Sequence, residues 1–431
     1  MRLLIIGGGP GGYETAVEAA KRGLEVTLIS EGPLGGTCLN EGCIPTKTFC
    51  HYAELIEQNL KAGLDCKPSF AAAAQRKQAV VEQLSSGIDM LLKNVQVVRG
   101  RAEFKDSKTV LCNGQEYTAD KIIIATGSVS ASLPIPGAES CLTSKDILDL
   151  TEVPESLCVI GGGVIGLEFA SIFRSFGSEV TVLEFCPGIL PRFDVDLAKR
   201  LKQSLSKRGI NIEVQAQVTR IDGNTVTCVK KDKEFTVQAD KILMAVGRRP
   251  NVDGLNLEAA GVDYTRKGIM VNDRFETSVP GIYAIGDVTG GIMLAHAATY
   301  QGLHALNGIC GQQDGIRFDL IPAAVFTIPE VATVGLTEEQ CKEQNLEVRC
   351  LKSFYRANGK AVSMDEPDGY CKVILDNDGK VLGSHIMGAH SSDLIHEIAT
   401  AMNIGATLDK LQSVIHAHPT LSEVIQSALH N

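Results

Sequence analysis

Two cysteines near the N-terminus carry the clearest signal of covalent chemistry. Cys38 and Cys43 are separated by four residues, and Cys43 opens a helical pattern that continues to about Asn59. A thiol at the start of a helix faces the positive end of the helix dipole, which favours the thiolate and lowers the thiol pKa. Gly42 gives the backbone freedom to bring Cys38 back onto Cys43. The spacing therefore predicts a small, accessible disulfide that opens and closes during catalysis.

The alternatives for this pair are two buried thiols or half of a zinc site. A zinc site needs two more ligands at similar spacing, and the sequence contains no C-x-x-C motif, so we expect no metal. We interpret the other eleven cysteines, among them Cys50, as packing residues. Lys47 follows Cys43 by one helical turn and shares its face, with a surface lysine as the alternative. Glu168 is the acid that we expect to pair with it.

A histidine near the C-terminus is followed by a carboxylate at a spacing suited to a general base. In the segment from His416 to Glu423, Pro419 forces His418 into an extended backbone and can itself start a helix. Helical side chains lean towards the N-terminus, so Glu423 can reach back to His418. Such a carboxylate selects one tautomer of the imidazole and raises its basicity. The alternative is a capping or core histidine; we assign no catalytic role to His416.

Two glycine-rich segments resemble each other and predict dinucleotide sites. The segment from Ile6 to Ala16 recurs between Ile160 and Ala170, and in each copy a short apolar run precedes the glycines and a run of β-type residues follows. Each copy therefore predicts strand, glycine turn, helix and strand. The first glycine allows the tight turn, the second lets a pyrophosphate approach, and the third lets helix pack on strand. These glycines are Gly7, Gly9 and Gly12 in the first copy and Gly161, Gly163 and Gly166 in the second.

A carboxylate after the second copy indicates which nucleotide binds there. Glu184 ends the following strand, 18 residues after Gly166. A carboxylate at that place accepts hydrogen bonds from a ribose 2′-hydroxyl and repels a 2′-phosphate, so we expect NAD rather than NADP. In the first copy the aligned residue is Ser30, and the acid Glu31 comes one place later. One glycine triplet alone is often an ordinary tight turn, but two copies predict two dinucleotides with electron transfer between them.

The elements that must position these residues fall into three parts. The apolar runs from Lys121 to Ser128 and from Lys241 to Arg248 resemble each other, and each is expected to close one nucleotide domain. The segment 134–137, with two prolines and a glycine, marks a linker between the domains, and Arg248 to Asn251 marks the exit from the second. Strand-like segments and then helical ones predict a third, α+β domain. They lie around 321–336, 369–388, 391–404 and 419–430.

The composition excludes several classes of function. With 431 residues the chain is too long for one ordinary domain, and 41 basic against 51 acidic residues give a net charge of −10. That charge, without a basic block, disfavours nucleic acid or an anionic membrane as the partner. Thirteen scattered cysteines argue against a secreted disulfide framework. No apolar stretch is long enough to span a membrane and Met1 leads directly into a predicted strand, so we expect a cytoplasmic protein.

Taken together, the motifs resemble the flavin-dependent pyridine nucleotide-disulfide oxidoreductases, and among them the dihydrolipoyl dehydrogenases. The resemblance extends over the whole chain. It implies FAD in the first domain, NAD in the second, and a C-terminal interface domain that forms a homodimer with shared active sites. It rests on the two glycine motifs and on the segments Gly35 to Lys47, Gly281 to Asp287, Met293 to His296 and His418 to Glu423.

The resemblance implies roles for the catalytic residues. Cys38 would exchange with the substrate, and Cys43 would contact the flavin. His418 from the partner chain would be the base, oriented by Glu423.

It also implies which residues hold the cofactors. Lys47, paired with Glu168, would lie beside the reactive flavin nitrogen, and Asp287 would line the ribityl chain. The other residues expected around FAD are Gly7, Gly9, Gly12, Glu31, Gly36, Thr37, the backbone of Ala102, Thr126, Gly127, Ser128, Met293, Leu294, Ala295 and His296. Those expected around NAD are Gly161, Gly163, Val164, Ile165, Gly166, Glu184, Val218 and Gly247.

We therefore expect an α/β protein with two Rossmann-like dinucleotide-binding domains and a C-terminal α+β dimerisation domain. The expected boundaries are 1–135 and 251–315 for the two parts of the FAD-binding domain, 136–250 for the NAD-binding domain and 316–431 for the interface domain. The implied reaction is oxidation of protein-bound dihydrolipoyl groups with NAD as acceptor. No lipoyl-bearing segment precedes Met1, so the expected partner is a lipoylated carrier, either a 2-oxoacid dehydrogenase acyltransferase or a glycine cleavage H-protein.

The alternatives are another NAD(P)H-dependent disulfide reductase of this family and a flavin-binding scaffold without turnover. Glutathione-type reductases share the disulfide and the histidine–glutamate pair but usually carry basic residues for the NADP phosphate. Mercuric reductases end in a cysteine pair, whereas the last cysteine here is Cys371, and transhydrogenases of this fold lack the complete redox pair. The presence of both redox cysteines together with the histidine and its carboxylate favours an enzyme over a scaffold.

Overall fold

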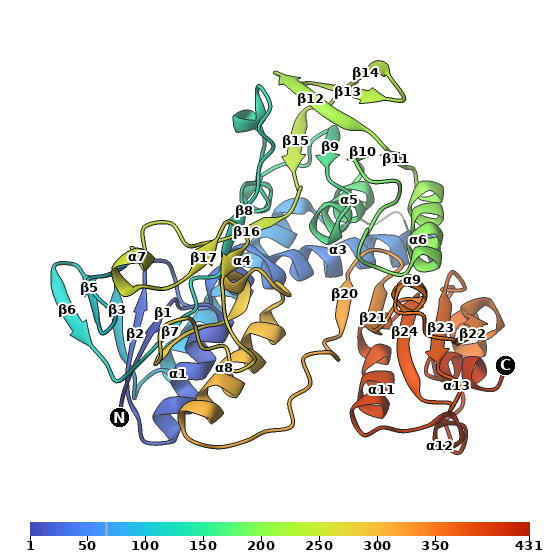
Figure 1. The fold of residues 1–431 in the computed structure, drawn as a ribbon. Coiled ribbons are helices and arrows are strands. Elements are labelled where there is room, and N and C mark those ends of the chain that lie inside the picture. The colour runs from blue at the N-terminus through green and yellow to red at the C-terminus, as the bar shows by residue number, and fades with distance from the viewer. Residues whose placement is uncertain (65–67) are drawn as a thin grey trace. The chain divides into compact units, whose positions relative to one another are not determined.

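The computed structural model describes residues 1–64 and 68–431, so Cys66, one of the cysteines expected to pack, lies outside the described residues. The chain forms two units, each assembled from three stretches of sequence (Figure 1). The first unit contains Met1–Thr48, Ala74–Ala131 and Gly247–Ile316. The second contains Phe49–Ala73, Ser132–Val246 and Arg317–Asn431.

A five-stranded parallel sheet forms the centre of the first unit. Its strands, in spatial order, are β19 (Ile282–Ala284), β7 (Lys121–Ile124), β1 (Arg2–Ile6), β2 (Glu25–Ser30) and β3 (Gln96–Arg99). Both faces of the sheet are covered, which is why its strands appear in the sequence as continuous apolar runs.

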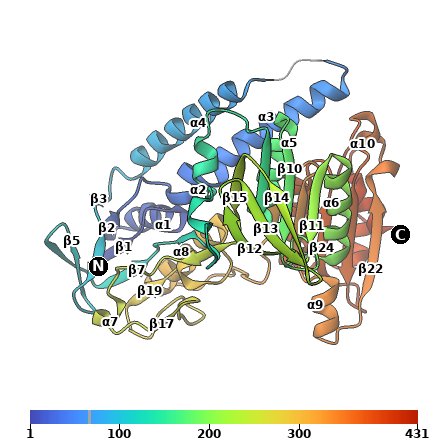
Figure 2. The same ribbon diagram turned by 90° about the horizontal axis from the view of Figure 1, so that it is seen from above.

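Helices cover one face of this sheet and a second sheet covers the other. Leu3 and Ile5 pack on the side of helices α1 (Pro10–Lys21) and α8 (Ala295–Ile309), which lie side by side in Figures 1 and 2. Leu4 and Ile6, which point the opposite way, pack on the side of a three-stranded antiparallel sheet. That sheet consists of β4 (Ala102–Phe104), β5 (Thr109–Cys112) and β6 (Gln115–Thr118).

Other elements belong wholly or partly to the first unit. Strands β8 and β16 pair as an antiparallel ribbon at the place where the chain leaves this unit and returns to it. Helices α3 and α4 each begin in one unit and end in the other. The elements are α2 (Gly36–Glu41), α3 (Cys43–Lys61), α4 (Phe70–Leu91), β8 (Ser128–Ser130), β16 (Arg248–Pro250), α7 (Leu257–Ala260), β17 (Tyr264–Thr265), β18 (Gly268–Ile269) and the 3-10 helix η3 (Gly286–Thr289).

The second unit repeats the nucleotide-binding pattern. Its four parallel strands are, in spatial order, β11 (Ile210–Val214), β10 (Glu179–Glu184), β9 (Ser156–Ile160) and β15 (Lys241–Met244). Helices α5 (Val164–Phe176) and α6 (Val195–Lys207) pack against them. An antiparallel sheet of β12 (Gln217–Asp222), β13 (Thr225–Lys230) and β14 (Lys233–Gln238) is seen from above in Figure 2. Two short 3-10 helices, η1 (Ala138–Ser140) and η2 (Asp146–Asp149), precede β9.

An antiparallel five-stranded sheet organises the C-terminal part of the second unit. Its order is β20 (Ala323–Val325), β21 (Val331–Gly335), β24 (Val381–Met387), β23 (Tyr370–Leu375) and β22 (Arg349–Phe354). Its main apolar core includes buried residues of helices α11 (Ser391–Asn403) and α13 (Glu423–Leu429). The other local helices are α9 (Glu338–Glu343), η4 (Tyr355–Ala357), α10 (Gly359–Ser363) and α12 (Leu408–Gln412).

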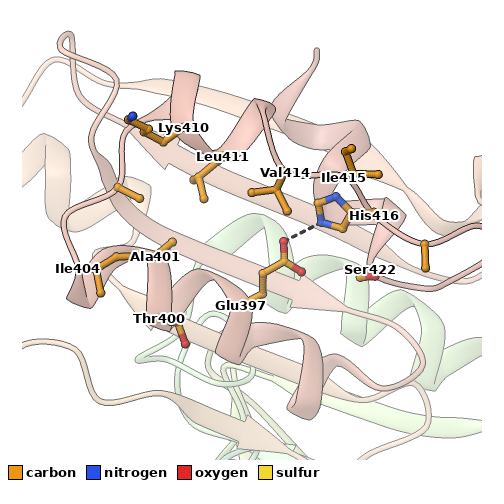
Figure 3. A pocket seen from close by; sticks show the side chains of 12 residues that line it. Glu397, Thr400, Ala401, Ile404, Lys410, Leu411, Val414, Ile415, His416 and Ser422 are labelled. Atoms are coloured by element: carbon orange, nitrogen blue, oxygen red, sulfur yellow. Dashed lines mark hydrogen bonds and ion pairs between the residues drawn. The ribbon is translucent and has the colours of Figure 1, made fainter.

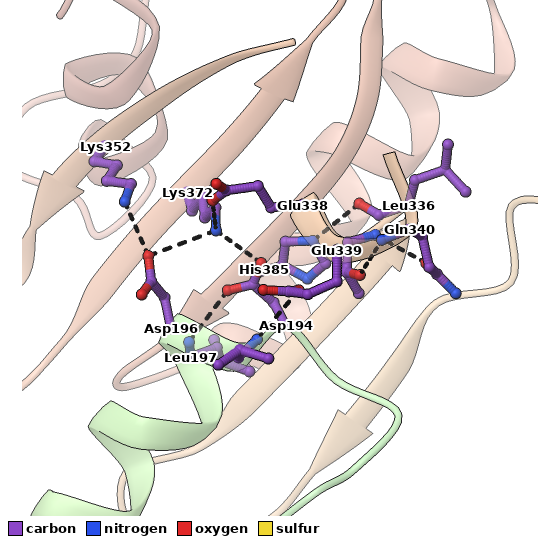
Figure 4. Close-up of polar contacts among 12 residues, drawn as sticks. Asp194, Asp196, Leu197, Leu336, Glu338, Glu339, Gln340, Lys352, Lys372 and His385 are labelled. Atoms are coloured by element: carbon purple, nitrogen blue, oxygen red, sulfur yellow. Dashed lines mark hydrogen bonds and ion pairs between the residues drawn. The ribbon is translucent and has the colours of Figure 1, made fainter. Parts of the chain in front are cut away.

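A fully buried lysine lies on the other face of this sheet. Lys372 of β23 has no exposed side-chain surface, and its Nζ lies 2.7 Å from Asp194 Oδ2 and 2.7 Å from Glu338 Oε2 (Figure 4). Asp194 caps helix α6 by accepting the N–H of Leu197 at 3.2 Å. Burial by itself lowers the pKa of Lys372, but its two hydrogen-bonded carboxylates raise it above the usual value, so the ammonium is retained.

Removal of this ammonium is expected to destabilise the second unit strongly. Lys372→Met leaves the carboxylate of Asp194 buried without its counter-charge, which costs about 3–5 kcal/mol. The matched control is Lys352→Met, because Lys352 pairs with Asp196 at 2.9 Å while both side chains are partly exposed; its loss is expected to cost under about 1 kcal/mol. Thermal and urea unfolding measure the difference, and equal effects of the two variants would contradict this reading of the cluster.

Glu54, on the helix α3 that begins at Cys43, has a raised pKa. Burial, and next the charges of Glu330 and Glu366, raise the pKa of Glu54 to about 7. In the unfolded chain this pKa is about 4.3, so the folded protein binds the extra proton between the two values. The free energy of unfolding therefore falls as pH rises from about 4 to 7 and stays reduced above that.

Replacement of Glu54 by glutamine is expected to remove this pH-dependent penalty. The variant should be more stable than the parent at pH 8, on the order of 1 kcal/mol because the group is partly solvated, and nearly equal to it at pH 4. Thermal unfolding at several pH values measures the effect. A stability difference that does not change with pH would show that the carboxyl does not titrate in this range.

The structure agrees with the expected order of strands and helices and adds elements that the sequence did not indicate. Among these are α2, α4, β22 and the two three-stranded sheets. One boundary was wrong: helix α13 begins at Glu423 rather than near Pro419, because Pro419 lies in a bend and a turn at Leu421 and Ser422 precedes the helix. In the described parts of the chain, no helix has both the length and the apolar character needed to cross a membrane.

Candidate functional site

The two glycine turns have the same geometry. Gly7 and Gly161 adopt φ of +116° and +114°, and a Cβ at either would collide with a backbone carbonyl of the neighbouring strand end. A Cβ at Gly12 or Gly166 would collide with the carbonyl oxygen of the turn glycine. These glycines are therefore required by the packing of the turn itself.

The middle glycines have a different reason to lack a side chain. A Cβ at Gly9 or Gly163 would meet no protein atom within 4 Å. Each of these residues is the N-cap of a helix, α1 or α5, and neither cap position is filled by a side-chain hydrogen bond. Helix N–H groups facing open space bind phosphate, so both turns fit a dinucleotide pyrophosphate.

The N-terminus of helix α8 lies near the first glycine turn. Gly11 of α1 approaches Ala298 of α8, and Thr15 approaches Gly302 four residues further along, so the two helices run in the same direction. Met293 and Leu294 precede α8, and Ala295 and His296 begin it. These residues lie at the end of α8 that corresponds to the first glycine turn, which is where the sequence placed the flavin.

Asp287 lies at the carboxyl end of strand β19 in the parallel sheet. It follows strand β19 within η3, and Ser128 follows β7. The hydroxyl of Ser128 donates to Asp287 Oδ2 at 2.5 Å. Carboxyl ends of adjacent parallel strands share one edge, where ligands of such sheets bind. The structure thus brings together two residues that were predicted separately for the FAD site.

Glu184 is held in place by backbone groups of the second nucleotide site. Its Oε2 accepts the N–H of Gly162 at 2.6 Å, and its Oε1 accepts the N–H of Cys186 at 2.6 Å. The carboxylate is almost fully buried. Each oxygen keeps a second lone pair, so the geometry fits a pair of ribose hydroxyls.

The first site lacks this carboxylate. Ser30 takes the equivalent place beside Gly8, where a Cβ on that glycine would meet the serine hydroxyl. The hydroxyl of Ser30 donates to the carbonyl of Gly32 at 2.9 Å, and Glu31 is exposed one place later. The contact of Glu31 with the FAD ribose stays a prediction.

The two cysteines of the predicted redox pair lie within hydrogen-bonding distance of each other. Cys38 belongs to the short helix α2, and Cys43 is the first residue of α3. A hydrogen bond with Cys43, followed by burial and the charge of Cys43, raises the pKa of Cys38 far above its usual value, while Lys47 opposes the rise. Cys38 therefore holds its proton more tightly than an ordinary thiol, and its hydrogen-bond partner Cys43 lies at the N-terminus of α3.

The remaining cysteines match the packing interpretation in part. Cys50, Cys112, Cys158, Cys228, Cys341 and Cys371 are buried. Four others are partly accessible, namely Cys141, Cys186, Cys310 and Cys350.

The predicted pair of Lys47 and Glu168 spans the two units, so it stays a prediction. Lys47 belongs to the first unit and Glu168 to the second. Within the second unit the buried Glu168 accepts the N–H of Phe326 at 3.0 Å through Oε1.

The predicted base and its carboxylate are in contact. Nδ1 of His418 lies 2.9 Å from Glu423 Oε1, and Glu423 Oε2 accepts the N–H of Thr420 at 2.8 Å. The N–H of Thr420 and next the histidine lower the pKa of Glu423, so it is ionised at neutral pH. The side chain of His418 is 79% exposed. Its Nε2 is thus the nitrogen available to take a proton from a substrate.

Two predicted contacts are restricted to the backbone, and one polar residue was missed. Ala102 and Val218 have buried side chains that belong to apolar cores, so only their backbones can face a cofactor. Arg248 donates two hydrogen bonds to Ser128. The signal for it was its place directly after Gly247 at the end of an apolar run.

Comparison with known proteins identifies the family. The family described as pyridine nucleotide-disulphide oxidoreductase matches residues 1–302, and its dimerisation domain matches residues 321–429. The second match supports a homodimer. Together the two matches cover nearly the whole chain.

Curated relatives and solved structures agree with this match. Dihydrolipoyl dehydrogenase of Bacillus subtilis is 40% identical, with 100% of this chain and 98% of the relative covered, and the mitochondrial enzyme of Pisum sativum is 39% identical, with 99% and 90% covered. The HOCl-induced flavoprotein disulfide reductase RclA from Escherichia coli is similar with 33% identity and a TM-score of 0.90, covering 100% of this chain and 99% of that one. LpdA from Mycobacterium tuberculosis is 30% identical with a TM-score of 0.91 and the same coverage.

These findings confirm the α/β fold class with two nucleotide-binding regions and a dimerisation domain. They also support FAD and NAD as the cofactors and disulfide oxidoreduction as the class of reaction. The chain belongs to the pyridine nucleotide-disulfide oxidoreductase family.

Proposed function

We propose that this chain oxidises dihydrolipoyl groups on a carrier protein and passes the electrons through Cys38, Cys43 and FAD to NAD. The observation that carries the proposal is the placement of Cys38, on α2, within hydrogen-bonding distance of Cys43, the first residue of α3. The full-length relatives named dihydrolipoyl dehydrogenase support the substrate.

The thiol chemistry consists of two exchange reactions. One substrate thiolate attacks Sγ of Cys38 in the oxidised pair, which breaks the Cys38–Cys43 bond and releases the Cys43 thiolate. The second substrate thiolate then attacks the substrate sulfur of the mixed disulfide, releasing Cys38 and the cyclic lipoyl disulfide. Two electrons thus move from substrate to the cysteine pair.

His418 is proposed to accept the proton that the substrate thiol releases. Glu423 holds Nδ1, so Nε2 receives the proton from the substrate thiol and the histidine becomes positively charged. The ionised Glu423 stabilises that charge. We propose that His418 acts on the cysteine pair of the partner subunit, as the family resemblance implies.

The two nucleotide sites are proposed to hold FAD and NAD, which carry out the electron transfer that side chains cannot perform. FAD, when bound, provides the two-electron relay between the cysteine pair and NAD. Glu184 is placed to accept the ribose hydroxyls of NAD and to repel the phosphate of NADP, which favours NAD as acceptor.

An open groove in the dimerisation domain supports the homodimer with shared sites. It has a volume of about 450 Å³ and lies on the segment that leads to His418 (Figure 3). Ile404 and Ile415 on its rim are 74% and 94% exposed. Apolar side chains gathered at such a surface are typical of an interface. His416 lines the groove and lies 2.8 Å from Glu397, apart from the proposed base.

We further propose a cytoplasmic enzyme that acts on a separate lipoylated carrier, either a 2-oxoacid dehydrogenase acyltransferase or a glycine cleavage H-protein. The proposed domain boundaries are those expected from the sequence. Neither nucleic acid nor a membrane has a role in this proposal, since the net charge is −10.

Purified protein with bound FAD tests the proposal. Dihydrolipoamide and NAD should yield NADH, with NADP giving a much lower rate. Lipoylated carriers of the two classes can then replace dihydrolipoamide, and the preferred one identifies the complex. Absence of NADH formation by FAD-loaded protein would reject the lipoyl substrate.

A further inference from the structure

The ribbon of β8 and β16 brings the missed arginine next to the flavin site. Arg248 pairs with Ser130 and Pro250 pairs with Ser128 in the register of the two strands. The N–H of Asn251 continues the ribbon by donating to the carbonyl of Gly127 at 2.9 Å. The ribbon therefore joins the exit of the chain from the first unit to its return.

The side chain of Arg248 begins a directed chain of hydrogen bonds. Its Nε donates to Ser128 Oγ at 2.7 Å, and its Nη2 donates to the Ser128 carbonyl at 2.7 Å. Because Ser128 Oγ accepts from the guanidinium, its own proton is available for Asp287 Oδ2, which lies 2.5 Å away. The guanidinium thus fixes the serine rotamer, and the serine fixes one oxygen of the carboxylate.

The charge of Arg248 also has nearby partners. Burial lowers the pKa of its guanidinium, whereas the charges of Asp287, Glu41 and Cys43 raise it. An arginine stays protonated under such conditions. It places one positive charge beside the carboxylate of Asp287, and bound FAD would add the negative charge of its pyrophosphate.

We propose that Arg248 is a positioning residue of the flavin site, which orients Asp287 through Ser128 and offsets its negative charge. This inference rests on the proposed place of Asp287 beside the FAD ribityl chain. It predicts that loss of the guanidinium weakens FAD binding chiefly through Asp287, because an unneutralised, misoriented carboxylate then faces the cofactor.

The first test measures the dissociation constant of FAD from apoprotein by the change in flavin fluorescence. Arg248→Met should raise it at least tenfold. Arg248→Lys, which keeps the charge but not the two-pronged donor, should lie between this variant and the parent. The matched control is Arg249→Met, because Arg249 is exposed and pairs with Asp253 at 2.9 Å on the surface. This control should stay within twofold of the parent.

A double-mutant cycle separates positioning from general support of the ribbon. In an Asp287→Asn background the carboxylate charge is absent, so Arg248→Met should change the FAD dissociation constant less than threefold. A purely structural arginine would weaken FAD binding equally in both backgrounds, and that result would overturn the proposal. Parental FAD affinity in Arg248→Met would overturn it as well.

Two further measurements keep the outcome interpretable. Thermal unfolding of each apoprotein shows whether a variant is folded, and if Arg248→Met is not, the same cycle is run with Arg248→Lys. The readout is FAD affinity, not lipoyl turnover. A parent that binds FAD but does not oxidise dihydrolipoamide would therefore reject the proposed substrate without touching this inference.

Discussion

Replacement of Cys43 by serine is expected to lower the rate of NADH formation from dihydrolipoamide at least about 1,000-fold, because a serine hydroxyl can neither form the disulfide nor carry the charge of the pair. The structure places Cys43 at the first residue of α3, hydrogen-bonded with Cys38. Cys38→Ser should cause a similar loss, since substrate exchange needs that sulfur. Steady-state kinetics with saturating NAD measure both variants.

The rest of the electron path provides the control for this prediction. Both variants should still bind FAD and oxidise NADH with an artificial electron acceptor, because neither cysteine takes part in hydride transfer. Cys50→Ser is the matched substitution on the same helix: Cys50 is buried and lies 3.3 Å from the carbonyl of Phe326, a contact that serine can keep. It should retain activity within a few-fold. Unchanged lipoyl turnover in Cys43→Ser would favour the scaffold alternative or a different route for the electrons.

The second large effect concerns the proposed base. His418→Gln is expected to lower lipoyl turnover by about 100- to 10,000-fold, the usual contribution of a positioned general base. Glutamine can accept the contact with Glu423 but cannot take a proton from a thiol at neutral pH. Glu423→Gln should have a smaller effect, about tenfold, because the imidazole remains and loses only its orientation and charge stabilisation.

The pH dependence distinguishes a base from a structural residue. The rate of His418→Gln should depend on pH differently from the parent rate, because glutamine cannot exchange a proton with the substrate thiol. Because the side chain of His418 is largely exposed, its replacement should leave the fold intact, and thermal unfolding checks this directly. A variant with the parent's pH profile and rate would remove His418 from the mechanism.

The local parts of the site were predictable because their causes are local. The sequence indicates a glycine turn directly, because Gly12 must leave room for the carbonyl of Gly7, which is only five residues away. Cys43 is the first residue of a helix formed by the residues that follow it, and His418 contacts Glu423, which is five residues away. These motifs predicted the family, which the comparisons confirm, and they predicted the places of the two nucleotide sites and the redox pair. The start of α13 was misplaced because Pro419 can begin a helix, but here Pro419 lies in a bend and the helix begins at Glu423.

Only the tertiary structure decided which distant residues support those motifs. Arg248 meets Ser128 across 120 residues, and Ser128 meets Asp287 across 159. Lys372 donates a hydrogen bond to Asp194, which is 178 residues away, and no sequence pattern around either residue indicates a buried ion pair. Such contacts arise when sheet edges and helix ends from separate stretches of chain converge in one core. Periodicity and spacing record how a segment folds with its neighbours, but not which distant charge will lie against it.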